Sequence, residues 1–157
     1  MEYLTLIKLN SVTGSFELFP RPARTRGWLI DNNGEPRIAM AYDKGRSSIH
    51  YKDPATSQWR VIAEFDPLSP EAFRPQGFGP DGTLFVTASM GRDKSAIYTY
   101  DLASNRIKPE AVFSLQNYDA SGDFVGNATG ILGVRYTAAS PNTYWFDTKL
   151  QLSLIHI

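Results

Sequence analysis

A histidine base beside a serine nucleophile is the first combination to look for, and the chain contains two histidines, His50 and His156. A nucleophile elbow reads Gly-x-Ser-x-Gly, because the sharp turn that exposes the serine needs small residues. Gly45-Arg46-Ser47-Ser48 lacks the second glycine, and in Gly14-Ser15 the serine stands in the wrong place. His50 is expected in mid-strand, facing solvent or a neighbouring sheet, so no Ser-His-Asp triad can be built around it. We therefore predict no catalytic residue in this chain.

Metal and cofactor sites are also not predicted. The chain has no cysteine, which excludes thiolate ligands and disulfides, and its few histidines leave zinc short of ligands. Asp81-Gly82-Thr83 and Asp31-Asn32-Asn33-Gly34 superficially resemble calcium loops but lack the D-x-[DN]-x-[DN]-G spacing. Turns explain both segments, because Asp and Asn bond their own backbone and Gly accepts a positive φ. The sequon Asn127-Ala128-Thr129 would matter only in a eukaryotic secretory protein.

Aromatic and charged residues suggest two further kinds of binding surface. Trp28, Trp59 and Trp145, with eight tyrosines, could form a stacking platform for sugars or bases. Packing between the sheets of a repeat fold is the simpler interpretation. The charged loops Asp43-Lys44-Gly45-Arg46 and Gly91-Arg92-Asp93-Lys94 lie 48 residues apart. We expect each to join the second and third strands of its unit at a solvated rim, contact with a second domain or a substrate being the alternative.

Composition limits the function classes further. The 157 residues include 16 basic and 16 acidic side chains, so the formal net charge is zero. A neutral chain lacks the positive surface that binds nucleic acid or anionic membranes. Hydrophobic residues make up 42% of the chain, which suffices for a folded core. No apolar run approaches the roughly 20 residues of a membrane span, and the first residues do not read as a signal peptide.

An internal repeat organises the elements that carry these residues. Gly34, Gly82 and Gly130 are spaced by 48 residues, and each precedes an apolar, strand-like run. The same spacing separates two further pairs, Ile49 from Ile97 and Asp53 from Asp101. Each repeat reads as four short strands joined by turns, in about 45 to 50 residues, which is the size of one β-propeller blade.

We therefore predict an all-β fold, a partial β-propeller of about three four-stranded antiparallel blades. The predicted parts are a half blade over 1–20, whole blades over 26–67 and 74–118, and an incomplete blade over 122–151. Residues 67 to 73 could hold one helical turn, since Ser69-Pro70-Glu71 suits an N-cap with proline at the first helical position. A β-sandwich, whose strands also recur at short intervals, is the alternative.

The repeat resembles a known propeller sequence. Residues 78–89, FGPDGTLFVTAS, followed by IYTYD at 97–101, are similar to W-S-P-D-G-x-x-I-A-F-x-S and x-I-Y-x-x-D. That pattern occurs in TolB-like propellers and in the N-terminal propeller of prolyl oligopeptidase family serine peptidases. Residues 27–37 and 144–147 are similar to blades of bacterial dipeptidyl- or acylaminoacyl-peptidase-like members, so the second resemblance is closer. It covers nearly all of residues 1–150.

The peptidase resemblance implies a role in a larger protein. In that family the propeller caps a C-terminal α/β-hydrolase domain with a Ser-Asp-His triad, excludes folded proteins and admits short peptides. The chain is then a fragment of the substrate-gating propeller, its partner is the hydrolase domain of the parent chain, and short peptides are the parent's substrates. The alternative is a non-enzymatic TolB-like propeller that binds other proteins. A Gly-x-Ser-x-Gly domain after residue 151 would distinguish the two.

The last six residues, LSLIHI at 152–157, have a different origin in this interpretation. The codons CTG TCT CTT ATA CAC ATC encode this string, and they match a transposon end used to prepare DNA sequencing libraries. We expect the native portion to end near Gln151, so that His156 has no function. A natural apolar strand is the alternative. The expected compartment is the bacterial cytoplasm or periplasm.

Overall fold

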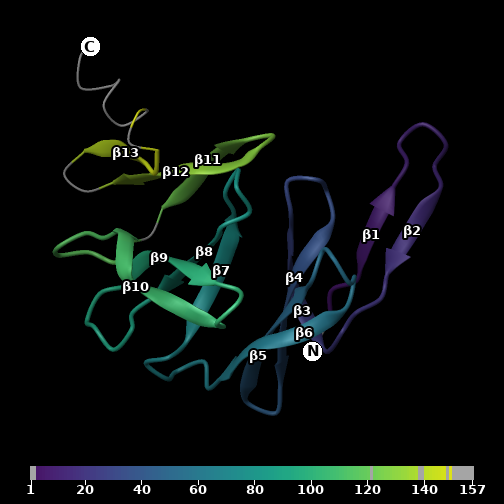
Figure 1. The fold of residues 1–157 in the computed structure, drawn as a ribbon, viewed down its shortest axis with the longest axis horizontal. Helices are drawn as coiled ribbons and strands as arrows, with labels where there is room; N and C mark the ends of the chain where they lie inside the picture. Colours follow the sequence, from purple (N-terminus) through teal and green to yellow (C-terminus); the bar gives the residue numbers. More distant parts are fainter. Residues whose placement is uncertain (1–2, 121, 138–139, 148, 150–157) are drawn as a thin grey trace. The chain divides into compact units, whose positions relative to one another are not determined.

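The computed structural model describes residues 3–120, 122–137, 140–147 and 149. Its regular elements in this part of the chain are thirteen β-strands (Figure 1). Gln151 and the predicted adapter-derived tail, 152–157, lie outside the described residues.

The strands form four antiparallel sheets in which each strand pairs with the next one along the chain. The first sheet is the hairpin of β1 (Leu6–Leu9) and β2 (Phe16–Phe19). The second contains β3 (Thr25–Ile30), β4 (Pro36–Asp43), β5 (Arg46–Lys52) and β6 (Trp59–Phe65). The third contains β7 (Phe73–Phe78), β8 (Leu84–Ala88), β9 (Ala96–Asp101) and β10 (Arg106–Phe113). The fourth contains β11 (Asp123–Asn127), β12 (Gly130–Thr137) and β13 (Pro141–Trp145).

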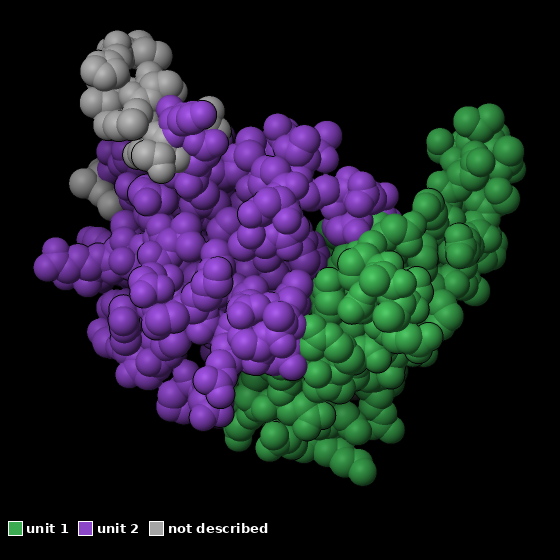
Figure 2. Space-filling view, in the orientation of Figure 1, with its two compact units in different colours: residues 1–30, 35–67 green, residues 31–34, 68–157 purple. Residues whose placement is uncertain are grey.

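This arrangement confirms the predicted all-β fold, a partial β-propeller built from four-stranded antiparallel units. The chain divides into two compact units, shown in different colours in Figure 2. The first comprises 1–30 and 35–67, and the second comprises 31–34 and 68–157. The turn between β3 and β4 thus groups with the second unit.

The inner strands of the third sheet, β8 and β9, are mostly apolar and mostly buried. In β8, three consecutive residues, Leu84, Phe85 and Val86, are buried. β10, at the sheet's outer edge, is largely exposed and polar. The prolines within this sheet, Pro75 and Pro109, lie in the edge strands β7 and β10, beside irregularities in the strand register. Proline has no N–H for a ladder, so it is tolerated at such positions.

The core of the second unit lies between the third and fourth sheets. Its buried members are Phe85, Ile97, Phe113, Ala120 and Val134. The ring of Phe113 packs against the rings of Tyr136 and Tyr144 on the fourth sheet, with centroids 4.9 and 5.1 Å apart. Aromatic pairs at this separation add to the stabilisation from burial.

The repeat appears in the structure as one recurring turn between the third and fourth strands of both four-stranded sheets. Asp53 Oδ1 accepts from the N–H groups of Ala55 and Thr56, at 2.7 and 3.4 Å. Asp101 Oδ1 accepts from Ala103 and Ser104 in the same pattern, at 2.9 and 3.4 Å. Four residues after each aspartate the backbone adopts a positive φ, 57° at Ser57 and 55° at Asn105.

The N-terminal hairpin contains the same turn. Asn10 Oδ1 accepts from the N–H groups of Val12 and Thr13, and Gly14 has a φ of 73°. The hairpin β1–β2 therefore corresponds to the third and fourth strands of a blade. The exact blade ranges stay a prediction.

The segment before β7 differs from the expectation. Residues 67–71 form turns, and the Ala72 N–H bonds to the Ser69 carbonyl at 3.0 Å, so the predicted helical turn is absent there. Phe73 pairs at once with Ala88 in the third sheet. The chain must be extended at that point, which leaves room for a β-turn alone.

No helix in the described ranges is long and apolar enough to cross a membrane.

Candidate binding site

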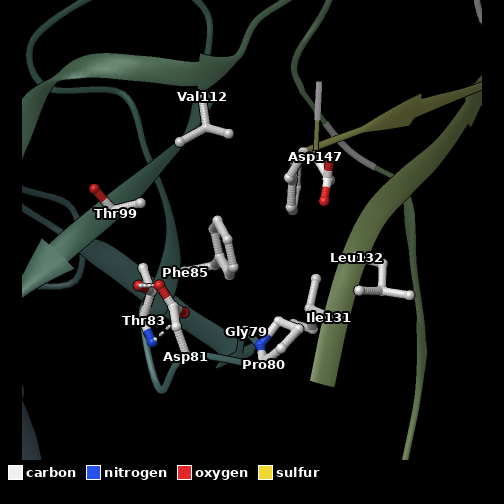
Figure 3. Close-up of a pocket in the computed structure, with 11 residues that line it drawn as sticks. Gly79, Pro80, Asp81, Thr83, Phe85, Thr99, Val112, Ile131, Leu132 and Asp147 are labelled. Atoms are coloured by element: carbon white, nitrogen blue, oxygen red, sulfur yellow. Dashed lines mark hydrogen bonds between the residues drawn. The ribbon is translucent and has the colours of Figure 1, made fainter. Parts of the chain in front are cut away.

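A pocket of about 420 Å³ opens in the second unit. Four segments line it: the β7–β8 turn, the faces of β8 to β10, the start of β12, and the residues that follow β13 (Figure 3). The lining residues are Gly79, Pro80, Asp81, Thr83, Phe85, Thr99, Val112, Ile131, Leu132, Phe146 and Asp147.

The floor of the pocket is apolar and aromatic. The rings of Phe85 and Phe146 stack, with centroids 4.6 Å apart and planes inclined by 27°. Phe85 belongs to the buried strand β8, so its position is set by the sheet. Ile131 approaches Gly77 so closely that a Cβ there would lie 2.6 Å from the Ile131 Cδ1. Gly77 thus makes room for the wall that Ile131 forms.

Two carboxylates flank this floor, on opposite sides of Phe85 in the view of Figure 3. Asp81 Oδ1 accepts the Thr83 N–H at 3.0 Å, and Oδ2 accepts the Thr83 hydroxyl at 2.8 Å. These bonds, with a smaller contribution from the positive charge of Lys108, lower the pKa of Asp81. Asp147 Oδ1 accepts the Lys149 N–H at 2.7 Å. Asp81 is therefore ionised at neutral pH, and the backbone orients both carboxylates.

A second hollow, of about 350 Å³, shares Asp81, Thr83 and Thr99 with this pocket and is lined mainly by polar residues. Asp101 and Lys108 contribute to it. The Ser104 hydroxyl and the Ala103 N–H lower the pKa of Asp101, with a small effect from Lys108. The carboxylates here bond to their own turns, as expected from turn chemistry.

His50 has a partner that sequence reasoning missed. On β5, the His50 Nε2 lies 3.0 Å from the Ser48 Oγ. Partial burial lowers the pKa of His50, while the charge of Glu64 opposes that shift. Residues i and i+2 share one face of a strand, and this spacing was the available signal. β5 pairs with strands on both sides, so its backbone N–H groups serve the ladders and offer no oxyanion hole.

The remaining candidates form packing or turn contacts. The rings of Trp28 and Trp59 meet edge-on at 5.9 Å, and Trp28 Nε1 donates to the Leu4 carbonyl at 3.1 Å. Trp145 packs over Gly133, whose Cβ would lie 3.2 Å from its ring. Asn127 of the sequon accepts from the Thr129 N–H at 2.8 Å and closes a turn. These contacts agree with packing and turn formation.

The charged loops join the second and third strands of their sheets. Lys44 and Gly45 have φ values of 49° and 84°, and Met90 and Gly91 have 49° and 76°. Two consecutive positive φ angles are typical of a turn of the primed type. At 44–45 this turn closes the two-residue hairpin between Asp43 and Arg46, whereas 90–91 lie within the longer loop between Ala88 and Ala96. The two pairs of positive-φ residues are thus 46 residues apart, whereas the glycines of the internal repeat are 48 residues apart. The aspartate of each loop forms an ion pair: Asp43 with Arg24, and Asp93 with Lys94 at 3.3 Å.

Within the described part of the chain, no group of three or more His, Cys, Asp or Glu residues could hold a metal ion.

Comparison with solved structures identifies a known fold that this chain resembles. No model of a known protein family matches the sequence, and no curated protein matches it. Among solved structures, the chain is similar to TolB from Acinetobacter baumannii, with a TM-score of 0.57 and 18% sequence identity. The match covers 90% of this chain and 34% of that chain, so the chain spans about a third of its length. At this identity the likeness shows the fold alone, a partial β-propeller. The prolyl oligopeptidase assignment stays a prediction.

Proposed function

We propose that this chain is part of a β-propeller that binds another protein and catalyses no reaction itself. The pocket of the second unit carries this proposal. Its aromatic floor offers apolar area, and its two carboxylates are held in position by backbone donors. A concave apolar site with a few fixed polar groups is the usual form of a binding site. Its lining contains no histidine, cysteine or lysine that could act as a base or nucleophile.

The first unit also exposes an apolar surface. Seven of the twelve large hydrophobic residues that are exposed in the described part of the chain lie between residues 3 and 18. Four of them, Ile7, Leu9, Phe16 and Leu18, are on the hairpin β1–β2. Apolar area of this kind is normally covered by another sheet of the same fold or by another protein.

A selection of displayed random peptides on the immobilised chain tests the proposal. We expect the wild type to enrich a defined peptide motif, and Val112→Trp, which fills the pocket, to lose those binders. Val61→Trp, at an exposed position on β6 of the first unit, is the matched control and should retain them. Failure of the wild type to enrich any motif, or equal enrichment by Val112→Trp, would contradict the proposal.

Substrate gating in a serine peptidase is the second candidate, supported by the repeat at 78–89 and 97–101. Its test is the gene beyond the codon for Gln151. We expect a Gly-x-Ser-x-Gly segment there, and covalent labelling of its serine by a fluorophosphonate probe in the full-length protein. A full-length product without such a segment, or with no labelled serine, excludes this candidate and leaves the binding module.

A further inference from the structure

We infer that the pocket binds an arginine side chain presented next to an apolar residue by the partner protein. This inference rests on the proposed function and names the chemistry of its ligand. Three features of the pocket support it: the balance of charge among its lining residues, the orientation of the two carboxylates, and the aromatic floor between them.

The charge of the lining favours a cation. Its eleven residues include two acidic side chains and no basic one. Asp81 has a lowered pKa, so it stays charged well below neutral pH. Two cations lie close by: Lys108 in the adjoining hollow, and Lys149, which follows Asp147 along the chain. Neither belongs to the lining, so the lining itself supplies no positive charge that would compete with a cationic guest.

The carboxylates are oriented without being saturated. Asp81 accepts two hydrogen bonds from Thr83, and Asp147 accepts one from the Lys149 N–H. A carboxylate has about four lone-pair positions, so both groups can accept further bonds. Fixing an acceptor before the ligand arrives removes part of the entropy cost of binding. A planar guanidinium with five donors suits such acceptors better than an ammonium does.

The floor suits the rest of the side chain. Arginine places a stem of three methylene groups against apolar surface while its charged head reaches a polar rim. Phe85, Phe146, Val112 and Ile131 offer that surface. A guanidinium over an aromatic face gains a further attraction, which grows as water is excluded. An apolar neighbour in the partner would cover the open side of the pocket.

The experiment compares two peptides that differ in charge alone: acetyl-Gly-Phe-Arg-Gly-amide and the same peptide with citrulline, which is neutral and nearly isosteric. Binding to the whole chain is followed by the backbone amide NMR shifts of residues 81–85, 131–132 and 146–147. We expect the arginine peptide to bind about tenfold more tightly, a difference of about 1.4 kcal/mol. We also expect that preference to shrink in 0.5 M salt, because screening weakens the ion pairs.

The double variant Asp81→Asn/Asp147→Asn should lose the preference, because the amide oxygens keep the turns while the charges are gone. The single variant Asp93→Asn is the control, since Asp93 is an exposed carboxylate of the same unit that faces Lys94. It should keep the preference. Lys149→Gln should leave the preference unchanged or increase it.

Equal binding of the two peptides at these amides would overturn the arginine inference and leave the proposed protein-binding function intact. Binding of neither peptide would overturn it too, and the random-peptide selection would then decide the proposed function separately. A preference that persists in the double variant would place the cation elsewhere and would also refute the inference.

Discussion

The side-chain amide of Asn32 donates a hydrogen bond to the carbonyl oxygen of Gly79, at 3.0 Å and across 47 residues of chain. The same amide also donates to the carbonyl of Thr129. One side chain thus joins three turns of the second unit, at 31–34, 79–82 and 127–130. These turns contain Gly34, Gly82 and Gly130, the glycines spaced by 48 residues. Turns that repeat at a fixed spacing in the sequence are therefore joined in the structure by one side chain.

The Asn32 amide should stabilise the second unit measurably. We expect Asn32→Ala to lower the free energy of unfolding by about 0.5–1.5 kcal/mol, the usual worth of such hydrogen bonds at partly exposed sites. Asn33→Ala, one residue away in the same turn, is the control and should change little. Urea midpoints of the two variants check this. Equal midpoints would show that the bridge contributes nothing.

Gly130 should tolerate no side chain. Its φ is 139°, and a Cβ there would lie 2.6 Å from the Phe78 carbonyl oxygen and 2.8 Å from the Asn32 Nδ2. Gly82 has a φ of 81° but open space around it. We expect Gly82→Ala to cost about 1–2 kcal/mol from backbone strain alone. Gly130→Ala should cost about 2–4 kcal/mol, because steric overlap adds to strain. Thermal midpoints should rank the variants in that order, and the reverse ranking would contradict the close approach.

His50 should make stability depend on pH below its ordinary pKa of 6.5. Burial lowers the pKa of His50 below its ordinary value of 6.5, against the opposing charge of Glu64. The unfolded chain therefore takes up the proton more readily than the folded one. The stability linked to neutral His50 is complete above pH 6.5 and is lost as pH falls through the folded pKa.

His50→Gln keeps a hydrogen-bonding partner for Ser48 but removes the titration. We expect its urea midpoint to fall less between pH 7.5 and pH 5 than that of the wild type. Identical pH dependence in the two proteins would show that His50 is not the group responsible.

Asp119 connects its own loop of the second unit to the loop that contains Ser95, through two hydrogen bonds that we call the Asp119 clasp. Its Oδ1 accepts from the Ser95 N–H at 2.8 Å and from the Ser95 hydroxyl at 3.0 Å, and these bonds lower the pKa of Asp119. The Ala120 N–H returns a bond to the Ser95 carbonyl at 2.9 Å. We expect the Ser95 amide to lose protection from hydrogen exchange in Asp119→Ala and to keep it in Asp119→Asn at neutral pH.

The charge of Asp119 adds a second test. Since its pKa lies below the ordinary 3.8, the clasp should persist above that pH and weaken as pH falls through the folded pKa. The NMR shift of the Ser95 amide should follow this titration. A Ser95 amide that titrates at or above 3.8 would contradict the clasp.

The sequence by itself determined the strands, the turns and the four-stranded repeat. Asp53 and Asp101 bond to N–H groups two and three residues away, so their turns depend on local chemistry that can be recognised in any sequence. The same holds for Asn10. Alternation and apolar runs likewise depend on which residues each strand must bury.

Tertiary structure alone decided the rest. The helical turn expected near Pro70 gave way because the pairing of Phe73 with Ala88 requires extended chain. Asn32 found its acceptors in two distant turns. The pocket combines residues from 79 to 147, and its floor exists because Phe85 and Phe146 meet across two packed sheets. Contacts of this range depend on how sheets stack, and stacking depends on the packed volumes of many side chains at once, which no local pattern encodes.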